Sequence, residues 1–287
     1  MTKLTWGPGV NPLKRLVDAV TWSLLALGAL AMAFPLFWML SGSLKTVEEI
    51  FTVPIVWLPA QPNFGSYTTV IAEAHIARAF LNSLIVTIPT VVTTVFFSSL
   101  AGYAFAKFRS LGLDILFTMV LAIMMIPLTV ILIPMYITAW ELKLLDTHVG
   151  LMLPRLMSAF GIFLFRQMMA NIPDELIDAA RIDGAGEFRI YWQIAMPLSK
   201  PAITSLAILS FQWTWNDFLW PVMISTSEKT RTIVLAVSVI QGSQEYGQSP
   251  FNELMAAATI ALLPLILVFV LGQRYFVSGI ASSGIKG

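Results

Sequence analysis

The sequence predicts an all-helical membrane protein with six transmembrane helices and a polar helix–turn–helix between the fourth and the fifth. Apolar residues make up 57% of the 287 residues, charged residues make up only 11%, and the mean hydropathy is +0.79. A soluble domain carries about 25% charged residues because water covers its surface, so lipid must be the solvent for most of this chain. One long polar segment, residues 171–200, interrupts the apolar stretches.

Six stretches are long and apolar enough to cross a bilayer, which takes about 20 residues. The first is expected to remain a helix and not to be removed as a signal peptide, because its apolar run exceeds the roughly 7–15 residues of a signal core. Prolines within the stretches predict kinks, which membrane helices tolerate. The expected spans are Val17–Leu40, Phe80–Ala106, Ile115–Ala139, Gly150–Ala170, Ala202–Ile224 and Leu254–Phe276, and the prolines are Pro35, Pro89, Pro127, Pro134 and Pro264.

The distribution of lysine and arginine predicts that both termini lie in the cytoplasm, where positive charges collect beside membrane helices. With that orientation the inner segments hold eleven of these residues and the outer segments hold six. Residues 1–16 are then a cytoplasmic N-terminus, and residues 17–287 form a single membrane domain. The polar segment 171–200 falls on the cytoplasmic side.

The composition excludes several classes of function. A net charge of +1 gives no field that would attract nucleic acid. The chain has no cysteine, which excludes disulfides, thiolate metal sites and a cysteine nucleophile. Its two histidines, His75 and His148, are too few and too far apart for a zinc motif. No catalytic or metal-ligating residue is therefore assigned. It lacks the GxxxxGK[ST] loop that cradles nucleotide phosphates, so it cannot bind ATP in that manner by itself. Because no charge lies near the expected midplane, a carrier driven by an ion gradient is disfavoured.

The polar segment carries the local signals of two short helices joined by a turn. Asp183-Gly184 is a turn signal, and Gly184 is free to adopt a positive φ. A second helix is expected over Glu187–Met196, with Pro197 marking its end. On this local evidence two interpretations stay open, an amphipathic linker that seals the underside of the bundle and a docking element for a cytoplasmic partner. The expected apolar side comprises Leu176, Ile177, Ala180 and Ile182 on the first helix, and Phe188, Tyr191, Trp192 and Ala195 on the second.

The spacing within this segment resembles the coupling motif in the permeases of ABC importers. Asp178-Ala179-Ala180 is followed after three residues by Gly184, after nine more by Ile194 and after two more by Pro197. The family pattern has glutamate where Asp178 stands and leucine where Met196 stands. The chain is most similar to the second, six-helix permease of maltose-type and glycerol-3-phosphate-type importers in the carbohydrate-import branch. The resemblance covers nearly the whole chain, including Ala101–Ala106, Gly161–Gln167 and Trp215–Pro221.

The resemblance implies a transport subunit and not an enzyme. It implies that ATP and Mg²⁺ bind to two partner ATPase subunits, while this chain itself binds no cofactor. A second permease subunit, an extracytoplasmic solute-binding protein and membrane lipid are the other implied partners. The implied process is import of a sugar, polyol or oligosaccharide by alternating access across a bacterial or archaeal inner membrane. The residues that the resemblance assigns to ATPase coupling are Asp178, Ala179, Ala180, Asp183, Gly184, Ala185, Ile194 and Pro197.

A second candidate site lies in the expected fifth span, where aromatic residues crowd together. Aromatic rings and planar polar side chains are groups that bind sugars, so this stripe is a candidate substrate path. Tryptophan also collects at membrane interfaces, so an interfacial belt or a gate stays open as the alternative. On a continuous helix the residues that share one face, at positions i, i+3, i+4 and i+7, are Trp213, Asn216, Asp217 and Trp220.

Three rival functions make different predictions. An importer of glycerol 3-phosphate or another polar solute needs the same partners but a different substrate path. An ATP-independent channel or secondary carrier predicts flux by this chain alone. A membrane scaffold predicts no flux.

Overall fold

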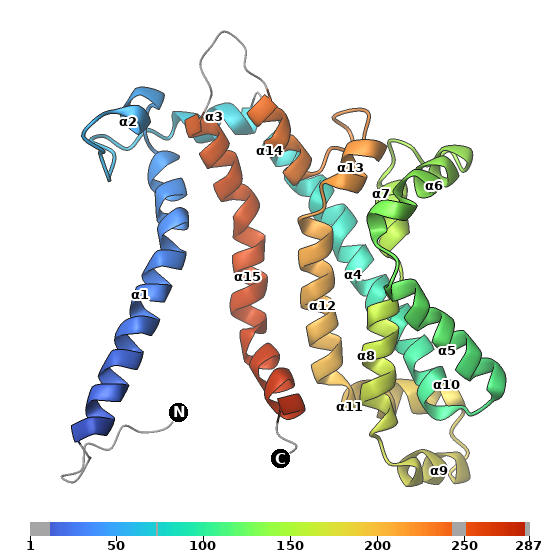
Figure 1. Ribbon diagram of the computed structural model, residues 1–287. Coiled ribbons are helices and arrows are strands. Elements are labelled where there is room, and N and C mark those ends of the chain that lie inside the picture. The colour runs from blue at the N-terminus through green and yellow to red at the C-terminus, as the bar shows by residue number, and fades with distance from the viewer. Residues whose placement is uncertain (1–11, 73, 243–250, 285–287) are drawn as a thin grey trace.

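The computed structural model describes residues 12–72, 74–242 and 251–284, and every regular element within these ranges is helical (Figure 1). The prediction of an all-helical membrane protein is confirmed. The elements are α1 (Pro12–Gly42), α2 (Val47–Phe51), α3 (Gly65–Ala72), α4 (Ile76–Lys107), α5 (Leu111–Met124), α6 (Leu128–Glu141), α7 (His148–Met152), the 3₁₀ turn η1 (Leu153–Arg155), α8 (Ala159–Ala170), α9 (Asp174–Ile182), α10 (Glu187–Ile190), the π-helical turn η2 (Tyr191–Ala195), α11 (Met196–Leu198), α12 (Lys200–Trp215), α13 (Leu219–Ile224), α14 (Ile233–Gly242) and α15 (Phe251–Gly284).

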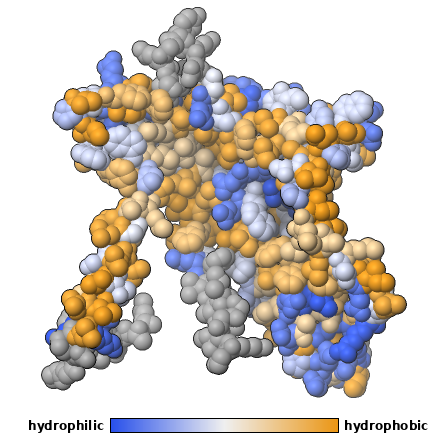
Figure 2. Space-filling view, in the orientation of Figure 1, coloured by the Kyte–Doolittle hydropathy of each residue, from blue (hydrophilic) through white to orange (hydrophobic). Residues whose placement is uncertain are grey.

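Three continuous helices of the described chain, α1, α4 and α15, are long and apolar enough to cross a membrane. Three further passages reach that length as bent pairs: α5 with α6, α7–η1 with α8, and α10–α11 with α12. Hydrophobic surface covers much of the molecule (Figure 2). By length and composition the described chain therefore has up to six spans.

The third predicted span, residues 115–139, is wrong as a single helix, because the chain turns by 103° between α5 and α6. Pro127 explains the break: it has no N–H to donate, and its ring disfavours helical backbone at the residue before it. Pro127 instead stands just before α6 with an extended ψ of 138°. The other four prolines lie inside helices, Pro35 in α1, Pro89 in α4, Pro134 in α6 and Pro264 in α15.

The fourth and fifth predicted spans also contain breaks. The fourth bends by 47° after η1, and Ser158 starts α8 by accepting a hydrogen bond from the Gly161 N–H at 3.2 Å. The fifth ends at Trp215, well before the predicted end at Ile224. The 16 residues of α12 extend about 24 Å, less than the bilayer core of about 30 Å. The short helix α13 follows α12 at the end of the molecule opposite α9 (Figure 1).

The central helix is α4, which packs along α8 and α12. Small residues permit this close approach, as is common between membrane helices. A Cβ added to Gly102 would lie 2.5 Å from Phe165 Cβ, and one added to Gly161 would lie 2.7 Å from Leu206 Cδ2. Polar side chains of α4 are buried in the bundle as well, namely Thr90, Thr94, Ser98 and Ser99.

The helix α1 differs from the other long helices because it stands apart from the bundle along most of its length (Figure 1). None of its spanning stretch is buried, and its C-terminal end touches α15, where Gly42 lies against Met255. The start of α1 and the end of α15 lie at the same end of the molecule as α9 (Figure 1). Of the predicted N-terminal segment, residues 1–11 lie outside the described chain, and residues 12–16 already belong to α1.

Candidate functional site

The polar segment forms two short helices at the end of the bundle where α1 begins (Figure 1). Asp174 and Glu175 occupy the first turn of α9, where the helix dipole favours negative charge. Ile177 is buried against the bundle, whereas Leu176 is exposed and Ile182 is 87% exposed. The expected single apolar face is therefore divided, because one part anchors α9 and the other faces outward.

A left-handed glycine joins the two helices, as the turn signal predicts. Gly184 has φ +80°, and its N–H donates to the Arg181 carbonyl at 3.0 Å. The Ala185 N–H donates to the Ala180 carbonyl at 2.9 Å. This pair of bonds is the Schellman arrangement, which terminates a helix with glycine in the left-handed region. A Cβ at Gly184 would meet no atom within 4 Å, so the backbone angle alone requires glycine.

An ionic network holds the two helices in register. The Arg181 guanidinium donates from Nε to Glu187 Oε1 at 2.7 Å and from Nη1 to Asp178 Oδ1 at 2.9 Å. The other oxygen of Glu187 accepts a hydrogen bond from the Tyr103 hydroxyl at 2.9 Å. Because Tyr103 belongs to α4, this network ties both short helices to the central helix of the bundle.

A second tie joins the start of α9 to the end of α4. Lys107 Nζ donates to the Ile172 carbonyl at 2.6 Å and to Asp174 Oδ1 at 2.7 Å. The hydrogen bond and the charge of Lys107 hold the pKa of the Asp174 carboxyl below its ordinary value. A third contact, between the hydroxyls of Ser99 on α4 and Tyr191 in the second helix, measures 2.8 Å. Three residues of α4 therefore hold the segment through polar contacts.

The second helix of the segment departs from its predicted form. It consists of α10, the π-helical turn η2 and α11, and Pro197 lies inside α11 and does not end the helix. The wide turn precedes Pro197, which removes a backbone donor and crowds the carbonyl four residues earlier. Tyr191 and Ala195 are buried, while Phe188 and Trp192 are exposed by 62% and 55%.

These exposures define an outward apolar surface on the polar segment, consisting of Leu176, Ile182, Phe188 and Trp192. Large exposed apolar side chains among charged ones mark interaction surfaces, and Figure 2 shows hydrophilic residues gathered at the same corner of the molecule. The predicted coupling residues lie on or beside this surface. Asp178, Ala179, Asp183, Gly184 and Pro197 are exposed, and Ala180, Ala185 and Ile194 are partly buried.

The predicted stripe in the fifth span is not one helical face, because α12 ends at Trp215. Trp220 is only 2% exposed, and its indole N–H donates to the Gly150 carbonyl at 2.9 Å. Asp217 accepts hydrogen bonds from Nε and Nη2 of Arg155, at 3.2 and 3.1 Å. Trp213 and Asn216 are exposed, so the structure separates two surface residues from one ion-paired and one buried residue.

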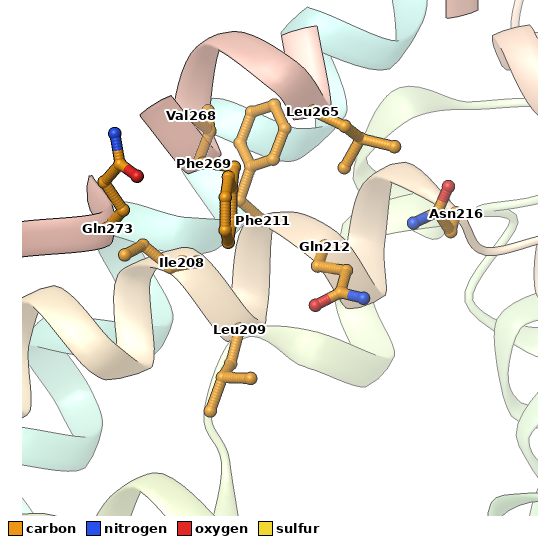
Figure 3. A pocket seen from close by; sticks show the side chains of 9 residues that line it. All are labelled: Ile208, Leu209, Phe211, Gln212, Asn216, Leu265, Val268, Phe269 and Gln273. Atoms are coloured by element: carbon orange, nitrogen blue, oxygen red, sulfur yellow. The ribbon is translucent and has the colours of Figure 1, made fainter. Parts of the chain in front are cut away.

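The exposed polar groups of α12 adjoin a cavity of about 380 Å³ between α12 and α15 (Figure 3). Its walls are mainly apolar, and its polar side chains are the amides of Gln212, Asn216 and Gln273. Figure 2 shows a hydrophilic area enclosed by hydrophobic surface where the upper part of α12 lies in Figure 1. Polar side chains at membrane depth face a partner or an aqueous path more readily than lipid. This face of α12 is therefore a candidate translocation surface.

Sequence reasoning missed the residues that position the polar segment. Arg181, Glu187, Tyr103 and Lys107 make its polar ties, yet none was singled out for a role. A signal for one tie was present, since Arg181 stands three residues after Asp178 on a helix. The Tyr103–Glu187 bond joins residues far apart in the chain and has no local signature.

Comparison with known proteins gives consistent relatives for this chain. Residues 95–282 match the family of the binding-protein-dependent transport system inner membrane component. The chain is 37% identical over 263 residues to the arabinooligosaccharide transport permease AraQ of Bacillus subtilis, covering 90% of this chain and 92% of the relative. It is 35% identical to the lactose transport permease LacG of Rhizobium radiobacter, covering 94% and 97%. It is 34% identical to the sn-glycerol-3-phosphate transport permease UgpE of Brucella abortus, covering 91% and 94%.

A solved structure shares the fold. It is a chain of a bacterial ABC transporter involved in the import of the acidic polysaccharide alginate, with a TM-score of 0.83 and 24% identity, covering 94% of this chain and 100% of that one. The family match and the relatives define a membrane permease subunit. The chain belongs to the binding-protein-dependent inner membrane components of ABC importers.

Proposed function

We propose that this chain moves a sugar, or a related polyol or oligosaccharide, into the cytoplasm by alternating access that partner ATPases drive. The carbohydrate assignment is supported by the arabinooligosaccharide and lactose permeases, which are 37% and 35% identical over nearly the full chain. The observation that carries the ATPase assignment is the outward surface of the polar segment, rigidly tied to α4.

Two ATPase subunits would receive this surface, and they would bind ATP and Mg²⁺. Ile182 and Phe188 are apolar groups for a cleft on the ATPase, and Asp178 and Asp183 supply charge beside them. Closure of the ATPases would push α9, and the Arg181–Glu187–Tyr103 and Lys107–Asp174 ties would pass that movement to α4. Because α4 packs on α8 and α12, the movement would reach the candidate translocation surface.

A second permease subunit would complete the pore. The spanning stretch of α1 has none of its surface buried within this chain, and the amides beside the α12–α15 cavity need a polar path or a partner. Both features suit a heterodimer in which the two permeases enclose the solute. A solute-binding protein would deliver the solute to the outer end, where α2, α3 and α14 lie (Figure 1).

The orientation follows from the same proposal. The ends of α1 and α15 share one end of the molecule with α9 (Figure 1). If the ATPases bind α9 in the cytoplasm, the starting end of α1 and the final end of α15 are cytoplasmic too. This agrees with the excess of lysine and arginine expected on that side.

Glycerol 3-phosphate is a second candidate solute, favoured by the UgpE permease at 34% identity. It differs from a sugar in charge, so it needs a cationic path. The choice between a sugar and glycerol 3-phosphate as the solute therefore depends on the charges along the translocation surface.

Purification of the tagged chain from its native membrane in mild detergent, with mass spectrometry of the accompanying proteins, tests the proposal. We expect a second permease and an ATPase to copurify, and reconstituted liposomes to take up saccharide only with ATP. Uptake by this chain alone without ATP would identify a channel or carrier instead. A chain that purifies alone and shows no flux would identify a scaffold.

A further inference from the structure

A second cavity, lined in part by hydroxyl-bearing and charged side chains, lies on another face of α12. Its volume is about 160 Å³. At 100° per residue its wall residues on α12 fall on a different side from those of the larger cavity. The other walls come from α4 and from the bend between η1 and α8. The lining residues are Thr94, Pro154, Arg155, Met157, Ser158, Ser210, Trp213 and Thr214.

Two hydroxyl groups of this cavity are buried without a hydrogen-bond partner among the described residues, Ser210 Oγ and Thr214 Oγ1. The residues are 4% and 9% exposed. Threonine in a helix ordinarily donates to the carbonyl four residues earlier, as Thr204 does at 3.0 Å and Thr259 does at 2.8 Å. An unsatisfied buried hydroxyl costs about 1–3 kcal/mol, so a ligand that supplied hydrogen-bond partners to these two neighbouring groups would recover that cost.

The polar side chains of the cavity carry little net charge. Arg155 is the single cationic residue in its lining, and Nε and Nη2 of its guanidinium both donate to Asp217 Oδ2. The Arg155 carbonyl accepts a hydrogen bond from the Thr94 hydroxyl, which fixes the backbone at η1. The guanidinium therefore presents hydrogen-bond donors to the cavity while the adjacent carboxylate cancels its charge.

An aromatic side chain completes the wall. Trp213 is 40% exposed, and its ring packs edge-on against Phe160 at a centroid distance of 5.9 Å. An indole offers an apolar face for the C–H groups of a sugar, next to hydroxyls and a guanidinium for its O–H groups. Cavities for drug-sized ligands measure about 300–1,000 Å³, so 160 Å³ accommodates only one part of a larger solute.

We propose that this cavity is a subsite for one ring of a neutral saccharide during its passage through the permease. Trp213 contacts the ring face, and Ser210, Thr214 and Arg155 exchange hydrogen bonds with its hydroxyl groups. The inference rests on the proposed importer function. It adds that this chain itself contacts the solute and that the contact selects an uncharged solute over a phosphorylated one, because a phosphate would meet Asp217 beside Arg155.

The test uses the complete complex in liposomes, with its partner permease, ATPases and solute-loaded binding protein at saturation. The probes are labelled arabinotriose, lactose and sn-glycerol 3-phosphate. Uptake per ATP hydrolysed is the readout, because transfer of the solute from the binding protein into a weakened subsite becomes less favourable while the ATPase cycle continues. Loss of folding would lower hydrolysis as well as uptake.

In the double variant Ser210→Ala/Thr214→Val we expect saccharide uptake per ATP to fall about tenfold, the effect of two lost hydrogen bonds, with hydrolysis within about twofold of wild type. The matched control is Thr232→Val, which removes another buried, unpartnered hydroxyl outside the cavity, and it should leave uptake per ATP unchanged. An unchanged double variant, or an equal loss in Thr232→Val, would overturn the subsite.

A charge variant tests the selectivity. Asp217→Asn leaves Arg155 with an uncompensated charge, so we expect the ratio of glycerol 3-phosphate to lactose uptake to rise at least about fivefold, equivalent to about 1 kcal/mol. A wild-type complex that imports glycerol 3-phosphate and rejects both saccharides would overturn the neutral-saccharide subsite and leave the importer function intact. A complex with no ATP-dependent uptake of any probe would overturn the proposed function itself.

Discussion

The polar segment at one end of the molecule and the aromatic stretch after α12 differ in how they are built. The segment is organised by local signals: acidic residues at the start of α9, a left-handed Gly184 and the Arg181–Asp178 pair one turn apart. The aromatic stretch is organised by distant contacts, in which Trp220 reaches Gly150 and Asp217 reaches Arg155. The first region is an outward-facing surface. In the second region some residues are exposed, Asp217 is ion-paired and Trp220 is buried in the core. Local signals therefore organise an exposed surface in the first region, whereas distant contacts decide which residues of the second region are buried.

The largest effect should follow from Gly184→Pro. Proline fixes φ near −65°, whereas Gly184 has φ +80° and donates its N–H to Arg181, so the turn between α9 and α10 cannot form. We expect loss of ATPase copurification and of uptake.

The control for this prediction is Gly186→Ala. Gly186 has φ −71°, and an added Cβ there meets no atom within 4 Å, so wild-type behaviour is expected. Wild-type uptake by Gly184→Pro would contradict the assignment of the segment to docking.

A paired substitution should separate the two tryptophans of the stretch. Trp220→Ala removes a buried, hydrogen-bonded side chain and should cost about 3–5 kcal/mol of stability. Trp213→Ala, at an exposed position, should cost about 1 kcal/mol or less. Thermal unfolding of the purified variants measures the difference. Equal melting temperatures would mean that the stretch is not divided into core and surface.

A smaller effect should come from Tyr103→Phe, which removes the hydrogen bond to Glu187. Because Glu187 is 41% exposed at its side chain, the bond contributes about 1 kcal/mol. We expect uptake per ATP to fall several-fold while the ATPase remains bound. Tyr67→Phe removes a comparable hydroxyl contact, with Ser43 just after α1, and should not change coupling. An equal effect in both variants would indicate a general loss of stability.

The smallest effect should come from Asp174→Asn. The Lys107 side chain is 2% exposed, but the Asp174 side chain is 64% exposed, so water screens the carboxylate and reduces the strength of the pair. In the variant Lys107 also keeps its bond to the Ile172 carbonyl. Lys107 lowers the pKa of Asp174. The pair therefore stabilises the folded protein fully above the ordinary pKa of an aspartate, and this stabilisation is lost as the pH falls through the lowered pKa. Uptake should therefore differ little from that of the matched Glu175→Gln variant, with no trend across about pH 6–8. A marked loss of uptake in that range would show that the Lys107–Asp174 pair contributes more to coupling than the exposure of Asp174 suggests.

Much of the fold could be predicted from the sequence because apolar length and turn chemistry are local properties. The span positions and the left-handed Gly184 follow from such signals. The break at Pro127 was predicted only as a kink. The local sequence does not indicate whether packing will keep a proline within a continuous helix, as happens at Pro89. The end of α12 was missed because Asn216 and Asp217 lie within an aromatic, apolar stretch whose composition is typical of a membrane helix.

The candidate sites were predictable to different depths. The spacing around Asp178 identified the coupling segment, but the division of its apolar residues into an anchoring and an outward set depends on where α4 lies. The cavity beside Ser210 and Thr214 has no sequence signature, since serine and threonine ordinarily satisfy themselves within membrane helices. Only the packed structure reveals that these two do not.

The central claim is that the outward surface of α9 and α10 contacts an ATPase. The chain has no cysteine, so single cysteines introduced in the intact complex report contacts directly. Ile182→Cys and Val53→Cys occupy positions of nearly equal exposure, 87% and 89%, one on α9 and one in the loop after α2 near the opposite end. With a short thiol-to-amine cross-linker we predict a product with the ATPase from Ile182→Cys only. Absence of that product, or an equal yield from Val53→Cys, would contradict the account.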